Sequence, residues 1–306
     1  MLNVTLVDGP PQEVREFDNE LTHKLTSDDV QVIREIFRTP LTGSYNWDYQ
    51  DANARIRKLY ELGKRFNWDA QMDVDWDTPF PRSETPNDPA GNAFAGHPKY
   101  EALTPEQKLD FHLRTAAYKP SQFLHGEQGA MLVASQLVSC APTYDAKLYA
   151  SSQTFDEARH VEVFHKYLTE RCKIVYPINP NLKLLLDKVL TDERWDLKFI
   201  GMQVLIEGLA LAAFQAMTQS TRDPLLRQIL ELVQRDEGRH VAFGVNYLED
   251  WIRALPEHEI EERAQFAYEA CVIMRERLFS VDVPQEYGST PEEAREINHN
   301  AMARGA

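Results

Sequence analysis

The stretch Asp156-Glu157-Ala158-Arg159-His160 recurs 80 residues later as Asp236-Glu237-Gly238-Arg239-His240. In each copy a glutamate and a histidine stand three residues apart, so an α-helix would present both side chains on one face. One Glu-x-x-His pattern is weak evidence, because such pairs are common on exposed helices. Two copies of the longer pattern at a fixed offset indicate the two halves of a single site.

A lone glutamate stands 30 residues before each copy, Glu127 in the first half and Glu207 in the second. If each half is a helical hairpin with its turn midway, both ligands lie about 22 Å from the turn, at ~1.5 Å per residue. Helix breakers occur midway in both halves, at 140–143 and at 221–224. The spacing therefore predicts the four-helix bundle of the di-metal carboxylate proteins.

The predicted ligands suit a pair of divalent metal ions. Four carboxylates in an apolar core would be costly without compensating charge. Two Fe(II) ions cancel that charge when the imidazoles are neutral, and oxygen and nitrogen ligands suit iron or manganese. The predicted ligands, which are also the predicted catalytic residues, are Glu127, Glu157, His160, Glu207, Glu237 and His240.

The residues beside the ligands form a second predicted set. A metal-bound histidine normally donates its other N–H to a carboxylate. We expect Asp156 and Asp236 each to orient the histidine of the opposite half, and Arg159 and Arg239 to neutralise them through bidentate pairs. The alternative interpretation is that these four residues form surface salt bridges.

Largely apolar side chains near the ligands suggest a dry substrate pocket. The candidates are Phe123, Met131, Phe164, Met202, Gln203, Leu211 and Phe214. The alternative is that they simply pack the core, which is the usual meaning of an apolar helical stripe.

The rest of the chain favours one all-α protein. Residues 1–100 are expected to contribute helices over 27–38 and 51–66, followed by an extended segment wrapping the core. Residues 101–280 should form the bundle, with core helices from about 104, over 143–171, 192–219 and 224–255, and a fifth outer helix over 257–279. Residues 281–306 are polar, which predicts an irregular tail.

Composition excludes several classes of protein. The net charge of −15 argues against a nucleic-acid partner or an anionic membrane surface. Three widely spaced cysteines suggest neither a disulfide framework nor a thiolate metal site. We find no signal peptide and no apolar stretch of ~18 residues, so we expect a cytoplasmic protein without a membrane span.

At these residues the chain resembles the ferritin-like di-iron carboxylate superfamily, over roughly residues 57–250. The relevant branch contains the ribonucleotide reductase small subunit, ligand-binding oxidases, multicomponent monooxygenases and acyl-carrier-protein desaturases. Asn67-Trp68, Ile206-Glu207-Gly208-Leu209-Ala210-Leu211 and His240-Val241-Ala242-Phe243-Gly244 resemble the ligand-binding oxidases in particular. The resemblance implies a ferritin-like bundle, the six residues above as iron ligands, a homodimer, and an external electron donor such as a ferredoxin or reductase.

Departures from the patterns of these subfamilies argue against a radical-storing role and against the cross-link of the ligand-binding oxidases. Phe164 stands where the reductase subunit has its radical tyrosine, and Gly129 and Met202 stand where the ligand-binding oxidases form a valine–tyrosine cross-link. Val233 replaces a third histidine of the arylamine N-oxygenases, and Leu211 replaces a threonine of the multicomponent hydroxylases.

The sequence therefore predicts a non-haem di-iron oxygenase or oxidase. It would use two Fe ions, or a manganese–iron pair, with O2 as co-substrate, to hydroxylate a small organic substrate. Acyl desaturation and N-oxygenation are alternatives at the same site. A ferroxidase or iron-storage protein is the alternative from another class, and the 100 or so residues before the first ligand count against it. A non-catalytic protein that keeps the site for stability is a third interpretation.

Overall fold

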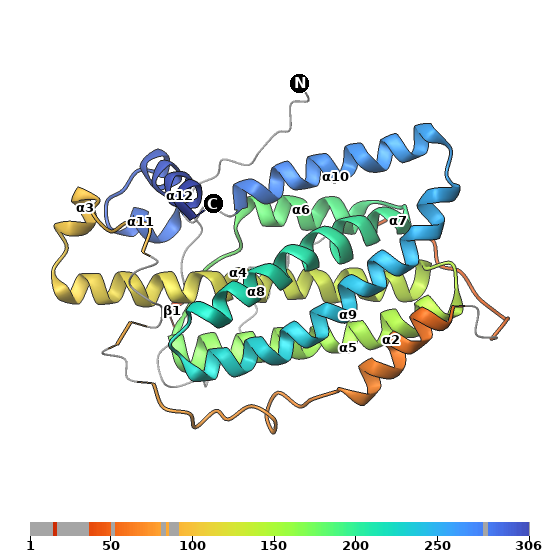
Figure 1. Cartoon of the computed structure of the whole chain (residues 1–306), viewed down its shortest axis with the longest axis horizontal. Helices are drawn as coiled ribbons and strands as arrows, with labels where there is room; N and C mark the ends of the chain where they lie inside the picture. The colour runs from red at the N-terminus through yellow and green to blue at the C-terminus, as the bar shows by residue number, and fades with distance from the viewer. Residues whose placement is uncertain are drawn as a thin grey trace, which may run out of the picture.

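The two repeats lie on long helices packed side by side (Figure 1). The structure is a computed structural model, and it describes residues 15–16, 37–49, 53–80, 84–85, 92–277 and 281–305. Within these residues the only strands are β1 (Arg15–Glu16) and β2 (Ile174–Val175), which pair antiparallel. The predicted all-α, ferritin-like fold is confirmed.

The first half of the site lies on a helical hairpin of α4 (Pro105–Cys140) and α5 (Tyr144–Lys166). At the start of α4, Thr104 accepts a hydrogen bond from the backbone of Gln107, whose side chain bonds back to Thr104. Thr143 caps α5 in the same manner, through the backbone N–H of Ala146. The turn thus falls where the breakers predict it.

The second half is a hairpin of the same kind. Its first arm is the continuous run of α7 (Trp195–Lys198), the π-helix η3 (Phe199–Ile206) and α8 (Glu207–Ser220). Its second arm is α9 (Pro224–Ala254), capped by Asp223. The first arm is long and apolar enough to cross a membrane by length and composition alone, contrary to our expectation. It carries Glu207 and packs against α9, as a core helix of the bundle does.

The connection between the hairpins contains structure that the sequence did not lead us to expect. The helix predicted over 143–171 ends in the π-helix η2 (Tyr167–Cys172). After it come two elements that we did not predict, β2 and α6 (Pro180–Thr191). Helix α6 packs against α4 and against the predicted fifth helix, α10 (Glu257–Arg277). Both α6 and α10 lie along one side of the bundle (Figure 1).

The N-terminal predictions are tested only in part. Of the helix predicted over 27–38, residues 27–36 lie outside the described residues, and Phe37 and Arg38 are not helical. The second predicted helix is present as α2 (Ala54–Arg65), which packs on α5 and α9. Residues 66–80, which follow it, run along the outside of the bundle (Figure 1). A short helix, α3 (Pro98–Glu101), comes later in the chain.

The prediction of an irregular tail over 281–306 is wrong. The chain forms α11 (Asp282–Glu286) and α12 (Pro291–Gly305). Thr290 and Glu293 exchange backbone-to-side-chain hydrogen bonds of 2.7 and 3.2 Å, which start α12. Glu293 also pairs with Lys99 at 2.5 Å, and Ala294 is fully buried. The helix therefore forms despite its polar composition, with a capping pair at its start and Ala294 and Ile297 on its packed side.

The apolar core forms two clusters, and the six ligand candidates lie between them. On α4, Phe123 belongs to one cluster and Val133 to the other, with Glu127 between. On α9, Val233 and Phe243 likewise belong to different clusters. Each core helix therefore passes from one apolar cluster to the other through a single polar layer.

Candidate metal centre

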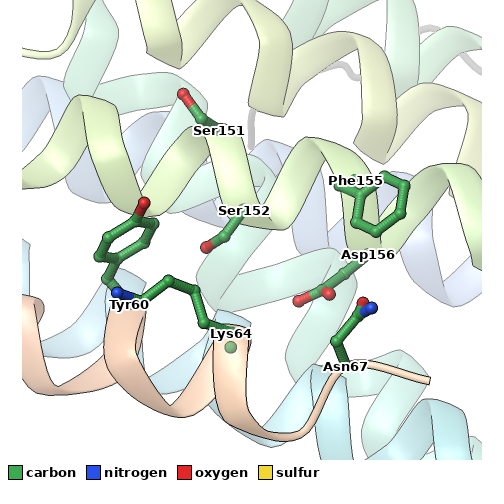
Figure 2. Close-up of a pocket in the computed structure, with 8 residues that line it drawn as sticks. Tyr60, Lys64, Asn67, Ser151, Ser152, Phe155 and Asp156 are labelled. Carbon is green, nitrogen blue, oxygen red and sulfur yellow. The ribbon is translucent and has the colours of Figure 1, made fainter.

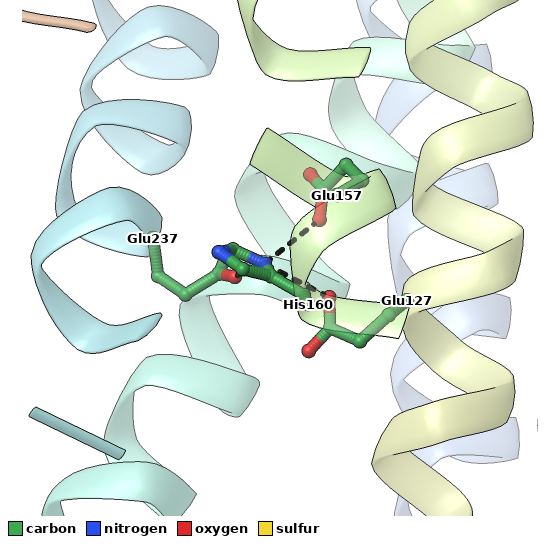
Figure 3. A group of neighbouring side chains, drawn as sticks. All are labelled: Glu127, Glu157, His160 and Glu237. Atoms are coloured by element: carbon green, nitrogen blue, oxygen red, sulfur yellow. Dashed lines mark hydrogen bonds and ion pairs between the residues drawn. The ribbon is translucent and has the colours of Figure 1, made fainter. Parts of the chain in front are cut away.

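The structure brings all six predicted ligands together inside the bundle. They form two groups whose ligand atoms lie within 4.8 Å of one another, Glu127, Glu157, His160 and Glu237 in one and Glu157, Glu207 and His240 in the other. None of the six is more than 4% exposed. Figure 3 shows the first group converging from three helices.

Both imidazoles point Nδ1 at the carboxylates. Nδ1 of His160 lies 3.2 Å from Oε2 of Glu157 and 3.0 Å from Oε1 of Glu237. Nδ1 of His240 lies 3.1 Å from Oε1 of Glu157 and 3.2 Å from Oε2 of Glu237. These two glutamates therefore stand between the histidines, where a carboxylate can contact two metal ions.

The other two glutamates each belong to one side. Glu127 places Oε2 at 3.4 Å from Nδ1 of His160, and Glu207 is grouped with His240. The site is thus two similar halves, each with one glutamate of its own and two shared with the other half.

Two aspartates hold the outer edges of the imidazoles. Nε2 of His160 lies 3.3 Å from Oδ2 of Asp236, and Nε2 of His240 lies 3.3 Å from Oδ2 of Asp156. Each aspartate therefore contacts the histidine of the opposite half, as the sequence led us to expect. This contact favours the tautomer that carries its proton on Nε2 and leaves Nδ1 free for a metal.

Two arginines join the aspartates into one buried network. Arg159 donates to Asp156 and, at 3.2 Å, to Asp236. Arg239 donates to Asp156 at 3.0 Å and to Asp236 at 2.7 Å. All four residues are buried, so they are interior pairs and not surface salt bridges. The predicted bidentate geometry is wrong, because a single nitrogen of each arginine, Nη2, contacts both aspartates.

Trp68 is a neighbour of the site that we did not predict as one. Its indole Nε1 donates to Oδ2 of Asp236 at 2.7 Å, and its carbonyl accepts from Arg159 at 2.7 Å. The guanidinium of Arg159 lies 4.9 Å from the indole ring. Trp68 follows the end of α2 in an irregular segment, so no helical periodicity connects it with the ligands.

The six ligand candidates shift one another's pKa values in the buried layer. Burial raises the pKa of Glu127 to about 8 and that of Glu207 well above its usual range. Burial acts on Glu157 and Glu237 too, but the adjacent histidines outweigh it, so both pKa values lie below the usual range. Burial opposes the imidazolium form, yet the carboxylates raise the pKa of both histidines well above the ordinary value. Burial therefore favours the neutral forms of Glu127 and Glu207, whereas the contacts between the histidines and the two shared glutamates favour the charged forms of both partners.

The donor set fits two divalent cations. Oε1 of Glu207 is buried and has no hydrogen-bond partner among the described residues. Oxygen atoms left without a donor in a dry interior are costly unless a cation contacts them. Two such cations would balance four carboxylates and two neutral imidazoles.

Comparison with known proteins identifies the family. The model of the p-aminobenzoate N-oxygenase AurF family matches residues 49–299. The chain belongs to the AurF family. With the buried cluster of glutamates and histidines, this membership makes it an enzyme, an O2-dependent oxidoreductase with a di-metal centre.

Solved structures similar to this AurF-family chain show the same fold. An R2-like ligand-binding oxidase with an aerobically reconstituted Mn/Fe cofactor has a TM-score of 0.55 at 17% identity, covering 84% of this chain and 96% of that one. A point mutant of such an oxidase, also with an aerobically reconstituted Mn/Fe cofactor, has a TM-score of 0.54 at 18% identity, covering 84% and 92%. The search of curated proteins finds no match.

The predicted substrate-pocket residues of this AurF-family protein differ in burial. Phe123, Phe164 and Phe214 pack against one another with ring centroids 4.4–5.9 Å apart. Met202 and Gln203 are fully buried, whereas Met131 and Leu211 are partly exposed. Gly129 leaves no room for a larger side chain, because a Cβ there would lie 2.4 Å from Cδ2 of Leu186.

A surface pocket reaches the network from outside. It has a volume of about 400 Å³, and none of the predicted substrate-pocket residues line it. Figure 2 shows α2 and α5 facing each other across it, with Asp156 among the lining residues. Because Asp156 also contacts His240, this aspartate lies between the pocket and the candidate metal centre.

Proposed function

We propose that the six residues hold two iron ions and that the enzyme uses O2 to oxygenate a small organic substrate. The observation that carries this proposal is the convergence of four carboxylates and two inward-pointing Nδ1 atoms in one buried layer. A manganese–iron pair is the alternative cofactor, supported by the Mn/Fe oxidases that share the fold.

We propose hydroxylation of a C–H bond as the first reaction type, because Val233 provides no third histidine. N-oxygenation of an amine is the second, supported by the family match. Incorporation of ¹⁸O from ¹⁸O2 into carbon or into nitrogen, measured by mass spectrometry of products from a panel of arylamines and amine-free aromatic compounds, separates the two.

The residues of the chain have distinct tasks in this mechanism. When bound, the metal ions supply the redox and Lewis-acid chemistry that activates O2. The glutamates and the Nδ1 atoms would hold the ions, while Asp156 and Asp236 fix the histidine rings through Nε2. The packed rings of Phe123, Phe164 and Phe214 keep water away from one side of the layer.

Anaerobic loading with Fe(II), followed by one pulse of O2, tests the proposal. We expect two iron ions per chain, and O2 consumption that yields oxygenated product when a substrate is present. Iron uptake far beyond two per chain would favour the storage function, and no binding would refute the metal centre.

We further propose that the protein is a cytoplasmic homodimer. We also propose that an external electron donor binds at the α2–α5 pocket. Support comes from the position of Asp156 in that pocket and against His240. Ser151 lines the pocket, and its hydroxyl donates to the carbonyl of Lys147 on its own helix. Ser151→Trp should slow reduction by a ferredoxin and leave reduction by dithionite unchanged; equal ferredoxin rates in both proteins would move the donor elsewhere.

A further inference from the structure

Each ligand glutamate has a buried side chain one helical turn before it. These positions are occupied by Phe123, Gln153, Gln203 and Val233, none of which is more than 7% exposed. Two of them are apolar and two are amides. The two halves of the centre therefore have the same ligand types but differ in which glutamate follows an amide, which is Glu157 in the first half and Glu207 in the second.

The two amides lie on the same side of the metal layer. Tyr149 on α5 and Met202 on η3 belong to one apolar cluster, whereas Phe123 and Val233 belong to the other. Nε2 of Gln153 donates to Oε1 of Glu157 at 3.0 Å. Nε2 of Gln203 then donates to Oε1 of Gln153 at 3.3 Å.

This pair of amides has a fixed direction. A carboxylate only accepts hydrogen bonds, so Gln153 must turn its NH2 group toward Glu157 and its carbonyl toward Gln203. Gln203 must therefore present its own NH2 group, and its Oε1 has no partner among the described residues. The orientation of both amides is thus set by Glu157.

A glycine on α9 admits the second amide. A Cβ at Gly244 would lie 2.6 Å from the Cβ of Gln203, closer than packed carbon atoms can approach. The π-helix η3 therefore lies against α9 at the turn that carries Gln203, which brings this side chain to Gln153.

We propose that Gln153, supported by Gln203, is a positioning residue that holds the Glu157 carboxylate and makes the two metal subsites unequal. The inference rests on the proposed metal centre. Oε1 of Glu157, which receives the amide hydrogen bond, is the atom 3.1 Å from Nδ1 of His240. The other shared ligand, Glu237, has a valine, Val233, at the equivalent position four residues before it, and a valine side chain cannot donate a hydrogen bond. The carboxylate is thus oriented before a metal arrives on the His240 side.

Anaerobic Fe(II) titration of two variants tests the role. Gln153→Leu removes the amide, and Gln153→Asn keeps an amide that is one methylene too short to reach Glu157. We expect both to bind the ion of the His240 subsite about 10–100-fold more weakly and the other ion with a smaller change. Gln203→Leu should cause a smaller loss in the same subsite. Mössbauer spectra of ⁵⁷Fe(II)-loaded protein should show the change in one of two iron environments.

Val233→Leu is the matched control, because it alters packing at the equivalent position of the other half. We expect both of its Fe(II) affinities to equal those of the parent protein. If Gln153→Leu and Gln153→Asn are folded by circular dichroism and bind both ions with parent affinity, the positioning role is rejected. If the parent chain does not bind two ions, the proposed function fails first.

Discussion

At the scale of single residues, the ligands differ in how many of the candidate metal groups they belong to. Glu157 belongs to both candidate metal groups, whereas Glu207 belongs to one. Glu157→Ala should therefore lower the occupancy of both ions, and Glu207→Ala should lower that of one ion only. Metal analysis after anaerobic Fe(II) loading and desalting measures the two stoichiometries. Equal losses in the two variants would contradict the shared position of Glu157.

The protonation of the same residues predicts a pH dependence. Glu127 and Glu207 have raised pKa values, as do both histidines. Two divalent ions must then displace two carboxyl protons and two imidazolium protons, so up to four protons are released. Because the folded protein holds these protons, metal affinity should rise with pH through the raised pKa values, among them that of Glu127, about 8. Calorimetry in buffers of different ionisation enthalpy counts the protons, and binding without proton release would contradict this charge balance.

At the scale of elements, the contact between η3 and α9 depends on a glycine. Gly244→Ala would place a Cβ 2.6 Å from that of Gln203. We expect this overpacking to destabilise the protein by about 1–3 kcal/mol. Gly238→Ala on the same helix is the control, because a Cβ added there would meet nothing within 4 Å, and alanine favours a helix by about 1 kcal/mol. Chemical denaturation measures both, and equal stability of the two variants would show that α9 can move aside.

The sequence predicted the elements that carry their own local signals. Helical periodicity and helix breakers predicted α2, the start of α4, and the positions of α5 and α9 to within a few residues. It did not predict α12, which contacts residues far along the chain, such as Lys99. The sequence analysis also did not predict α6, because the ligand repeat does not extend into the connection between the two hairpins.

The candidate site was predictable only where its residues follow a local sequence pattern. The ligands and their aspartate partners follow helical spacing and a repeat, so the pattern shows them directly. Gln153 lies four residues before Glu157 and could have been found by that spacing. Trp68 could not, because its hydrogen bond to Asp236 spans 168 residues and depends on the course of an irregular segment.

At the scale of the whole molecule, the ligand layer joins the two apolar clusters. Four of the ligands lie on α5 and α9 and the others on α4 and α8, so a bound ion ties together helices from both hairpins. Metal that binds only the folded chain stabilises it by about 2.7 kcal/mol per site at a hundredfold excess over Kd. Binding should therefore raise the melting temperature of the entire bundle, not of one hairpin.

Thermal unfolding with and without anaerobic Fe(II) tests this coupling. We expect one transition, followed equally by helical circular dichroism and tryptophan fluorescence, that moves up by several degrees when Fe(II) replaces a chelator. Glu157→Ala, which loses a ligand common to both groups, should show little or no such shift. Two separate transitions, of which only one responds to metal, would mean that the hairpins unfold independently and that the polar layer does not hold the bundle together.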